Sequence, residues 1–308
     1  MKKLNIPVGI SDFREIRENG YYYIDKTFLI YELLKTPATK VTLITRPRRF
    51  GKTLGMSMLA DFFDIRKESS SLFEGLDISE KASICNEWMN QYPVIFLSLK
   101  DIDGLTFEDA YGQLVAQIAD LYKEYTYLLE CAEIDEDDKK IFLDLKAGKA
   151  DKVQITRSLG TLMKMLQIYY HKPVILLLDE YDVPVAKASN HGYYNEMLDI
   201  MKGIMSTALK DNQALRFAVI TGCLKIAKES IFTGTNNFVS DTIRDSRYNE
   251  YFGFTQTEVD KILNDSGCIE HAENVREWYD GYHFGEVDVY CPWDVMNYLR
   301  DLQHDIMA

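Results

Sequence analysis

The chain is organised around one stretch, Val41-Thr42-Leu43-Ile44-Thr45-Arg46-Pro47-Arg48-Arg49-Phe50-Gly51-Lys52-Thr53. The apolar run at its start suits a central parallel strand that is buried on both faces. A short basic loop follows, and the apolar residues after it recur at helical spacing, which predicts a helix from about Lys52 to Asp64. A strand, a tight loop and a helix in this order are typical of a phosphate-binding loop.

The end of this loop, Gly51-Lys52-Thr53, has the residue types that phosphate binding requires. Glycine lets the backbone approach a phosphate closely, lysine reaches the β- and γ-phosphates, and the threonine hydroxyl can ligate Mg²⁺. The N-terminus of the helix directs its N–H groups and positive dipole end toward the same phosphates. We expect the Walker A residues to bind a nucleotide; these are Arg48, Arg49, Phe50, Gly51, Lys52 and Thr53. Thr53 is also expected to ligate the metal ion.

The loop departs from the common pattern G-x-x-x-x-G-K-[ST] at its first position. Counting back from Gly51 places Arg46 where that pattern has glycine, and Pro47 after it has no N–H. The first turn of the loop must therefore form without glycine. We expect the guanidinium groups of Arg46, Arg48 and Arg49 to attract a triphosphate. Alternatively, one of them pairs with Glu180 or Asp182 when the site is empty.

A second strand ends in two acidic residues. An apolar run over 174–178 is followed directly by Asp179 and Glu180. Open α/β sheets bind ligands at the carboxyl ends of their strands, so Asp179 is expected to hold Mg²⁺ together with Thr53, as a Walker B residue does. Glu180 can then orient and deprotonate the attacking water, whereas Asp182 is expected to be a loop or cap residue. The alternative is an ordinary strand that ends in a solvated acidic turn.

A third apolar run, over 215–222, brings a polar residue to the same edge. Thr221 stands near its end and is expected to face the γ-phosphate or the attacking water. The tetrapeptide N-K-x-D, with which many GTPases read guanine, does not occur in the chain. An Asp-Glu strand end with an intervening strand fits ATPases that carry a catalytic glutamate, so ATP is the expected nucleotide.

Composition limits the class of protein. The 308 residues are 46% hydrophobic and carry a formal net charge of -13. The acidity argues against a broad nucleic-acid surface, because such affinity comes mainly from Lys and Arg on phosphates, but it leaves room for a local basic groove. No apolar run is long enough for a membrane span, the N-terminus lacks a signal-peptide segment, and the five cysteines form no C-x-x-C. We therefore expect a cytoplasmic protein with reduced thiols, no zinc site and no membrane partner.

Further periodicities predict the fold class. Apolar runs predict strands at about 93–99, 174–179 and 215–222, and helical spacing predicts a helix from about Asn195 to Leu209. Strands that alternate with helices indicate an α/β domain with a mostly parallel sheet flanked by helices. From about Ile243 the pattern changes to helices, aromatic residues and glycine turns. We expect the α/β domain at 1–242 and a smaller, mainly helical C-terminal subdomain at 243–308.

The first 35 residues hold a tyrosine cluster and a short amphipathic segment. The segment Phe28–Leu34 predicts a helix that Asp25 or Thr27 caps. Because it precedes the strand of the phosphate loop, it is expected to lie over the nucleotide base. Asp25 is therefore a candidate nucleotide-binding residue, and the tyrosines are expected to belong to the core.

Several motifs occur in order along nearly the whole chain: Tyr23-Ile24-Asp25-Lys26-Thr27, Arg46-Pro47-Arg48-Arg49-Phe50-Gly51-Lys52-Thr53, Leu178-Asp179-Glu180-Tyr181-Asp182-Val183-Pro184, Thr221-Gly222, Ser230-Ile231-Phe232-Thr233-Gly234, Asn236-Asn237, Trp278-Tyr279-Asp280-Gly281-Tyr282 and Tyr290-Cys291-Pro292-Trp293. With these motifs the chain resembles the bacterial predicted AAA-ATPase-like proteins. Members of that family often carry a C-terminal PD-(D/E)XK nuclease-like domain.

The resemblance implies a P-loop ATPase with a helical or winged-helix-like C-terminal subdomain. The family also has Arg-Pro at the start of its loop, and it has Tyr-Asn-Pro-Trp where this chain has Tyr290-Cys291-Pro292-Trp293. The chain ends at Ala308, about where the nuclease-like part would begin, so it is either truncated or naturally short. The tripeptide Asp137-Asp138-Lys139 matches the nuclease motif literally, but it lies in a charged helical stretch and is expected to be a solvated face.

These observations favour Mg²⁺-dependent ATP hydrolysis that is coupled to movement of the C-terminal subdomain or of an unidentified protein partner. One alternative is a nucleotide-gated interaction module with negligible turnover. Another is the ATPase part of a nuclease-linked protein that processes nucleic acid.

Overall fold

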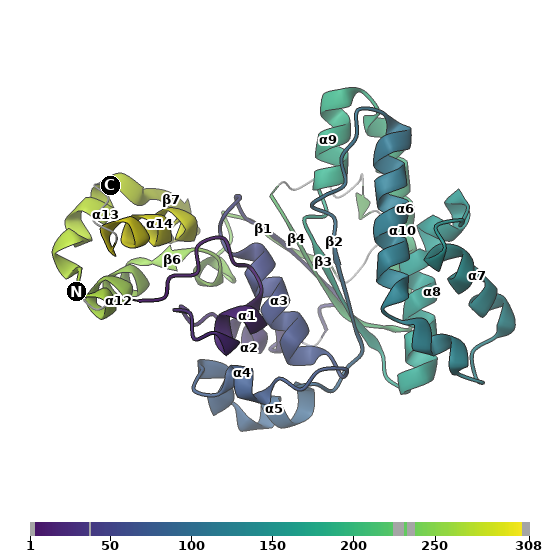
Figure 1. The fold of residues 1–308 in the computed structure, drawn as a ribbon, viewed down its shortest axis with the longest axis horizontal. Helices are drawn as coiled ribbons and strands as arrows, with labels where there is room; N and C mark the ends of the chain where they lie inside the picture. Colours follow the sequence, from purple (N-terminus) through teal and green to yellow (C-terminus); the bar gives the residue numbers. More distant parts are fainter. Residues whose placement is uncertain (1–3, 37, 224–230, 233–237, 304–308) are drawn as a thin grey trace.

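The computed structural model describes residues 4–36, 38–223, 231–232 and 238–303. It contains a five-stranded sheet with helices on both faces and, to one side, a smaller unit with its own sheet (Figure 1). Two of the family-like motifs, at 230–234 and 236–237, lie outside the described residues apart from Ile231 and Phe232.

The large sheet is parallel throughout. Its strands are β1 (Val41–Thr45), β2 (Val94–Ser98), β3 (Val174–Asp179), β4 (Leu215–Gly222) and β5 (Phe238–Asp241). Their order is β2-β3-β4-β1-β5, so β4 lies between β1 and β3. This order confirms the expected mostly parallel sheet and the intervening strand. It also places the carboxyl ends of β1, β3 and β4 at one edge.

Helices cover both faces of this sheet (Figure 1). The first face carries α1 (Phe13–Glu18), α2 (Phe28–Leu34), α3 (Lys52–Phe63), α4 (Ser70–Phe73) and α5 (Ala82–Trp88). The second carries α6 (Phe107–Lys123), α7 (Glu136–Lys146), α8 (Lys152–Tyr170), α9 (Val183–His191) and α10 (Tyr194–Leu209). Short 3-10 helices are η1 (Asp77–Glu80), η2 (Thr126–Glu130), η3 (Asn249–Tyr251) and η4 (Ile269–His271). The predicted helices after the phosphate loop and before β4 are confirmed in α3 and α10.

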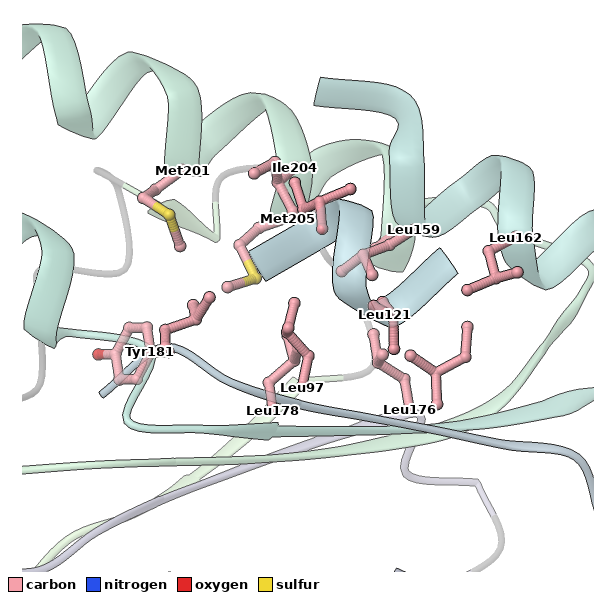
Figure 2. Close-up of a cluster of buried hydrophobic side chains, with 14 of the residues drawn as sticks. Leu97, Leu121, Leu159, Leu162, Leu176, Leu178, Tyr181, Met201, Ile204 and Met205 are labelled. Carbon is pink, nitrogen blue, oxygen red and sulfur yellow. The ribbon is translucent and has the colours of Figure 1, made fainter. Parts of the chain in front are cut away.

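The main core lies between the sheet and the layer of α6, α8 and α10 (Figure 2). Leucines from β2 and β3 point toward the helices, which contribute leucine, isoleucine and methionine side chains. The labelled members are Leu97, Leu121, Leu159, Leu162, Leu176, Leu178, Tyr181, Met201, Ile204 and Met205. Each fully buried side chain of this size contributes about 1.5–3 kcal/mol to folding, so this layer fixes β3 and its carboxyl end firmly in place.

The smaller unit combines three short antiparallel strands with helices. Its strands are β6 (Phe254–Thr255), β7 (Asp280–Phe284) and β8 (Val287–Tyr290), in the order β6-β8-β7. Its helices are α12 (Gln256–Ser266), α13 (Ala272–Tyr279) and α14 (Pro292–Gln303). The small sheet adds to the helices that the sequence predicts for this part of the chain.

The beginning of the chain packs onto this smaller unit. Ile24 belongs to its core, and Ile6, Val8 and Tyr22 pack against the same cluster. The Lys26 ammonium also pairs with Glu258 of α12. These contacts tie residues 4–8 and 22–26 to α12 and α14, whereas α1, which lies between them in the chain, packs on α3. We therefore propose that residues 4–8 and 22–26 belong structurally with the C-terminal unit, in addition to the expected residues 243–308.

Candidate functional site

Three side chains from three elements meet at the carboxyl edge of the large sheet. Asp179, at the end of β3, is fully buried. Its Oδ2 accepts a hydrogen bond from the Thr53 hydroxyl on α3 at 2.8 Å, and its Oδ1 accepts one from the Thr221 hydroxyl on β4 at 2.6 Å. Parallel pairing of β3 with β4, and of β4 with β1, brings these positions together although they are far apart in the sequence.

Lys52 stands beside this group at the first position of α3. Its side chain is buried, and its ammonium donates to the carbonyl oxygens of Arg46 at 3.1 Å and Pro47 at 2.9 Å. The Cys223 thiol lies 3.4 Å from the same ammonium. Gly51, immediately before it, has φ of 79°, which places it in the left-handed region. The ammonium is thus held inside the loop by uncharged acceptors that an anionic phosphate could replace.

Glu180 is half-buried and borders the same cavity as Lys52 and Thr53. Its φ of 54° is uncommon for a residue other than glycine, and such backbone conformations are concentrated at functional sites. Burial raises the pKa of its carboxyl group, an effect that Lys52 opposes and Asp179 reinforces. The side chain is therefore well placed to accept a proton close to the loop.

Asp182 has a structural environment. It is buried at the start of α9, and its carboxylate accepts the Cys223 N–H at 3.1 Å. A Cβ at Gly222 would come within 2.5 Å of the Asp182 carboxylate, so this approach requires glycine after Thr221. The position agrees with a cap or loop role for Asp182.

Arg46 is not where the sequence predicts it. The expectation that its guanidinium faces a triphosphate is wrong, because the side chain is fully buried and forms an ion pair with Asp241 of β5 at 2.6 Å. It also donates to the Thr45 carbonyl at 2.9 Å. The charge is therefore used to hold β1 against β5 at the position where the common motif has its first glycine.

The other residues of the Arg46–Gly51 loop separate into two groups. Arg48 and Arg49 are exposed, and the Arg49 guanidinium lies over the ring of Trp293 at 5.0 Å. Phe50 is buried against β7, with its ring 5.2 Å from that of Phe284. Two arginines thus stay available for an anion, whereas the Phe50 side chain is committed to the C-terminal unit.

A cavity of about 270 Å³ opens next to the loop. Its wall is formed by the N-terminal segment with α1 and α2, the loop with the start of α3, Glu180 after β3, and the C-terminal unit. Apolar side chains around it include Val8, Ile10, Ile24, Met58, Phe254 and Met296. Lys52, Thr53 and Glu180 border the same cavity, so its lining combines charged and apolar side chains.

Asp25 lies outside the residues that border this cavity, although its neighbours Ile24 and Lys26 are among them. Its Oδ1 accepts hydrogen bonds from the N–H of Thr27 at 2.8 Å and from the Thr27 hydroxyl at 2.7 Å. Its Oδ2 accepts the N–H of Asp77 at 2.7 Å. Oδ1 thus fixes the residue before α2, and Oδ2 fixes the first residue of η1.

Several residues that border the cavity are not predicted from the sequence as binding residues, among them Tyr23, Lys26, Trp293 and Met296. Tyr23 and Lys26 stand in a motif quoted above, and so does Trp293, but no chemistry in those motifs indicates which ligand they face. Their contribution depends on tertiary packing of the two ends of the chain.

The donors present fit a magnesium ion that shares its ligands with a nucleotide. Mg²⁺ in such sites is typically held by one or two protein oxygens and completed by water and phosphate oxygens. The Thr53 hydroxyl and the Asp179 carboxylate, 2.8 Å apart, supply such a pair. Within the described residues no group of three or more His, Cys, Asp or Glu side chains is arranged around a metal position, as a dedicated protein cage would require.

No helix in the described part of the chain has the length and apolar character to cross a membrane.

The sequence of the chain matches a known protein family. A family model described as predicted AAA-ATPase matches residues 7–232, and the chain belongs to this AAA-ATPase-like family. The chain is also 30% identical over 299 residues to a protein of Azotobacter chroococcum mcd 1 named "Uncharacterized protein in vnfD 5'region". The alignment covers 96% of this chain but 52% of that protein, so the chain spans about half the length of the curated relative.

Proposed function

We propose that the protein binds ATP with Mg²⁺ and hydrolyses it at the carboxyl edge of the large sheet. The observation that carries this proposal is the convergence of Thr53, Asp179 and Thr221, with Lys52 and Glu180 beside them. Membership of the predicted AAA-ATPase family supports it.

Each residue has a distinct role in this proposal. Bound Mg²⁺ would neutralise charge on the phosphate oxygens. Thr53 and Asp179 would hold the ion, and Lys52 would leave the carbonyl oxygens of the loop to contact the β- and γ-phosphates. Glu180 would orient the attacking water and accept its proton, and Thr221 would position the water or the γ-phosphate.

The same cavity also indicates where the nucleotide base would bind and how hydrolysis would be coupled to movement. Its apolar side chains can pack against the planar adenine base, and the exposed Arg48 and Arg49 can assist with the phosphates. The C-terminal unit forms part of its wall, so a bound nucleotide would contact both units. We propose that hydrolysis is coupled in this way to movement of the C-terminal unit, which we assign as winged-helix-like, or of a protein partner.

The most direct test is steady-state release of phosphate from ATP by the purified chain. The measurement should be made with Mg²⁺, with a chelator in its place, and with and without DNA. Release that requires Mg²⁺ supports the proposal. A nucleotide-gated module would bind ATP without release, and stimulation by DNA would favour the nuclease-linked alternative.

Replacing Lys52 by alanine should weaken ATP binding by roughly 1.5–3 kcal/mol, because a charge-assisted hydrogen bond to phosphate is lost. Calorimetric titration with ATP and Mg²⁺ measures this change. Lys164→Ala is a suitable control, since Lys164 is an exposed lysine of α8 that pairs with Asp138 on the helical layer. If Lys52→Ala binds ATP as tightly as the control, the loop is not the nucleotide site.

A further inference from the structure

Phe50 connects the Arg46–Gly51 loop to the small sheet. It directly precedes Gly51 and Lys52, yet only 1% of its surface is exposed. Its ring centroid lies 4.7 Å from that of Tyr282 and 5.2 Å from that of Phe284, both on β7. A side chain next to the phosphate-binding glycine is therefore part of the core of another unit.

The fit around Phe50 is close. Gly253 has φ of 106°, and a Cβ at that position would come within 3.2 Å of the Phe50 ring and of Val289. Val289 and Cys291 complete the apolar cluster around Phe50 and Phe284. Substitution at any of these positions would change the seating of the ring and, with it, the backbone of the loop.

The other end of the loop reaches the same aromatic group. The Arg46 guanidinium lies 5.2 Å from the ring centroid of Phe284 and 5.8 Å from that of Phe252. Cations at this distance from an aromatic ring are attracted to it. Arg46 and Phe50, the first residue of the loop and the last before its glycine, thus both contact Phe284.

The loop needs external support for a physical reason. It lacks the first glycine of the common motif, contains Pro47, and has a non-glycine residue, Arg49, at φ of 69°. Backbone conformations of this kind persist only where the surrounding structure holds them in place. The contacts of Phe50 and Arg46 with β7 provide that support.

We infer that Phe50 is a positioning residue, through which β7 and β8 hold the loop in its phosphate-binding conformation; this inference rests on the proposed function. Linkage is reciprocal, so ATP binding must in turn stabilise the contact of the loop with β7 and β8. The loop and the small sheet then form one nucleotide-responsive unit. A merely structural Phe50 would stabilise the fold without this response.

The test compares Phe50→Leu with Phe142→Leu. Phe142 is a fully buried phenylalanine of α7, on the opposite side of the large sheet, packed against Tyr122. Both variants lose buried aromatic surface, but only Phe50→Leu should weaken the binding of ATP with Mg²⁺, by about 5-fold or more, the lower range of coupling between sites. Hydrogen exchange over 281–290 should slow when ATP binds to the wild type and to Phe142→Leu, and respond less in Phe50→Leu.

Equal ATP affinity of the two variants, with the same ATP-induced slowing of exchange, would overturn the inference and leave the proposed function intact. Failure of the wild type to bind ATP would overturn both. If Phe50→Leu does not fold, Tyr282→Ala decides, because Tyr282 is 41% exposed and its removal leaves no buried cavity. A weaker ATP affinity and a reduced exchange response in that variant support the inference, and wild-type values for both refute it.

Discussion

Replacing Glu180 by glutamine should lower the rate of ATP hydrolysis at least ~10²-fold, the lower range for loss of a general base, while ATP affinity stays near that of the wild type. Glutamine keeps the shape of the side chain and most of its hydrogen bonding but cannot accept the proton of the attacking water. Single-turnover hydrolysis and calorimetric binding, measured on the same preparation, separate the two effects.

The surroundings of Glu180 explain why it, rather than its neighbours, is expected to act as the base. Both oxygens of Asp179 accept hydrogen bonds from threonine hydroxyls, and the carboxylate of Asp182 accepts a backbone N–H. Glu180 instead borders the cavity, and burial raises the pKa of its carboxyl group, which makes it a better proton acceptor. Loss of Asp179 should differ, because it should harm both Mg²⁺-dependent binding and hydrolysis.

Glu124→Gln provides a matched control. Glu124 is an exposed glutamate that follows α6 near Arg66, away from the loop. The Glu124→Gln substitution should leave the rate of ATP hydrolysis unchanged. Equal measurable rates for Glu180→Gln and the wild type would exclude Glu180 as the base and make Asp182 the next residue to test. Little hydrolysis by either protein, with an ATP-dependent change in conformation or partner binding, would favour the nucleotide-gated module.

The sequence predicts the central elements because their signals are local. The apolar runs of β1, β3 and β4 and the helical spacing of α3 appear within single windows, and their ends fall within a few residues of the structure. The convergence of Thr53, Asp179 and Thr221 follows from the rule that parallel strands present ligands at their carboxyl ends. The geometry brings these three residues together, and their roles in binding and hydrolysis stay predictions.

The parts that the sequence does not predict depend on distant contacts. Strand β5 is short, and nothing in Phe238–Asp241 identifies it as the neighbour of β1. The sequence around Arg46 predicts a phosphate-binding arginine, because its partner Asp241 lies 195 residues further along the chain. In the same way, the packing of the N-terminal segment on α12 and α14 depends on apolar residues that have no local periodicity of their own.

Breaking the Arg46–Asp241 pair should destabilise the protein strongly. Both side chains are buried, with exposures of 0% and 2%, and removal of one partner leaves an uncompensated charge away from water. Asp241→Asn and Arg46→Met should each lower the free energy of unfolding by about 3–5 kcal/mol, as for other buried ion pairs. Urea denaturation followed by circular dichroism measures the change.

An exposed pair supplies the control, and a double variant separates stability from function. Asp199→Asn removes a partner of the exposed Lys152 and should cost less than about 1 kcal/mol. Arg46→Met combined with Asp241→Leu replaces both charges by apolar groups and should recover most of the lost stability, because neither charge remains buried alone. Equal stability of Asp241→Asn and Asp199→Asn would show that the pair does not hold β1 against β5. If the double variant regains stability but still binds ATP weakly, the Arg46 guanidinium positions the loop as well as stabilising the sheet.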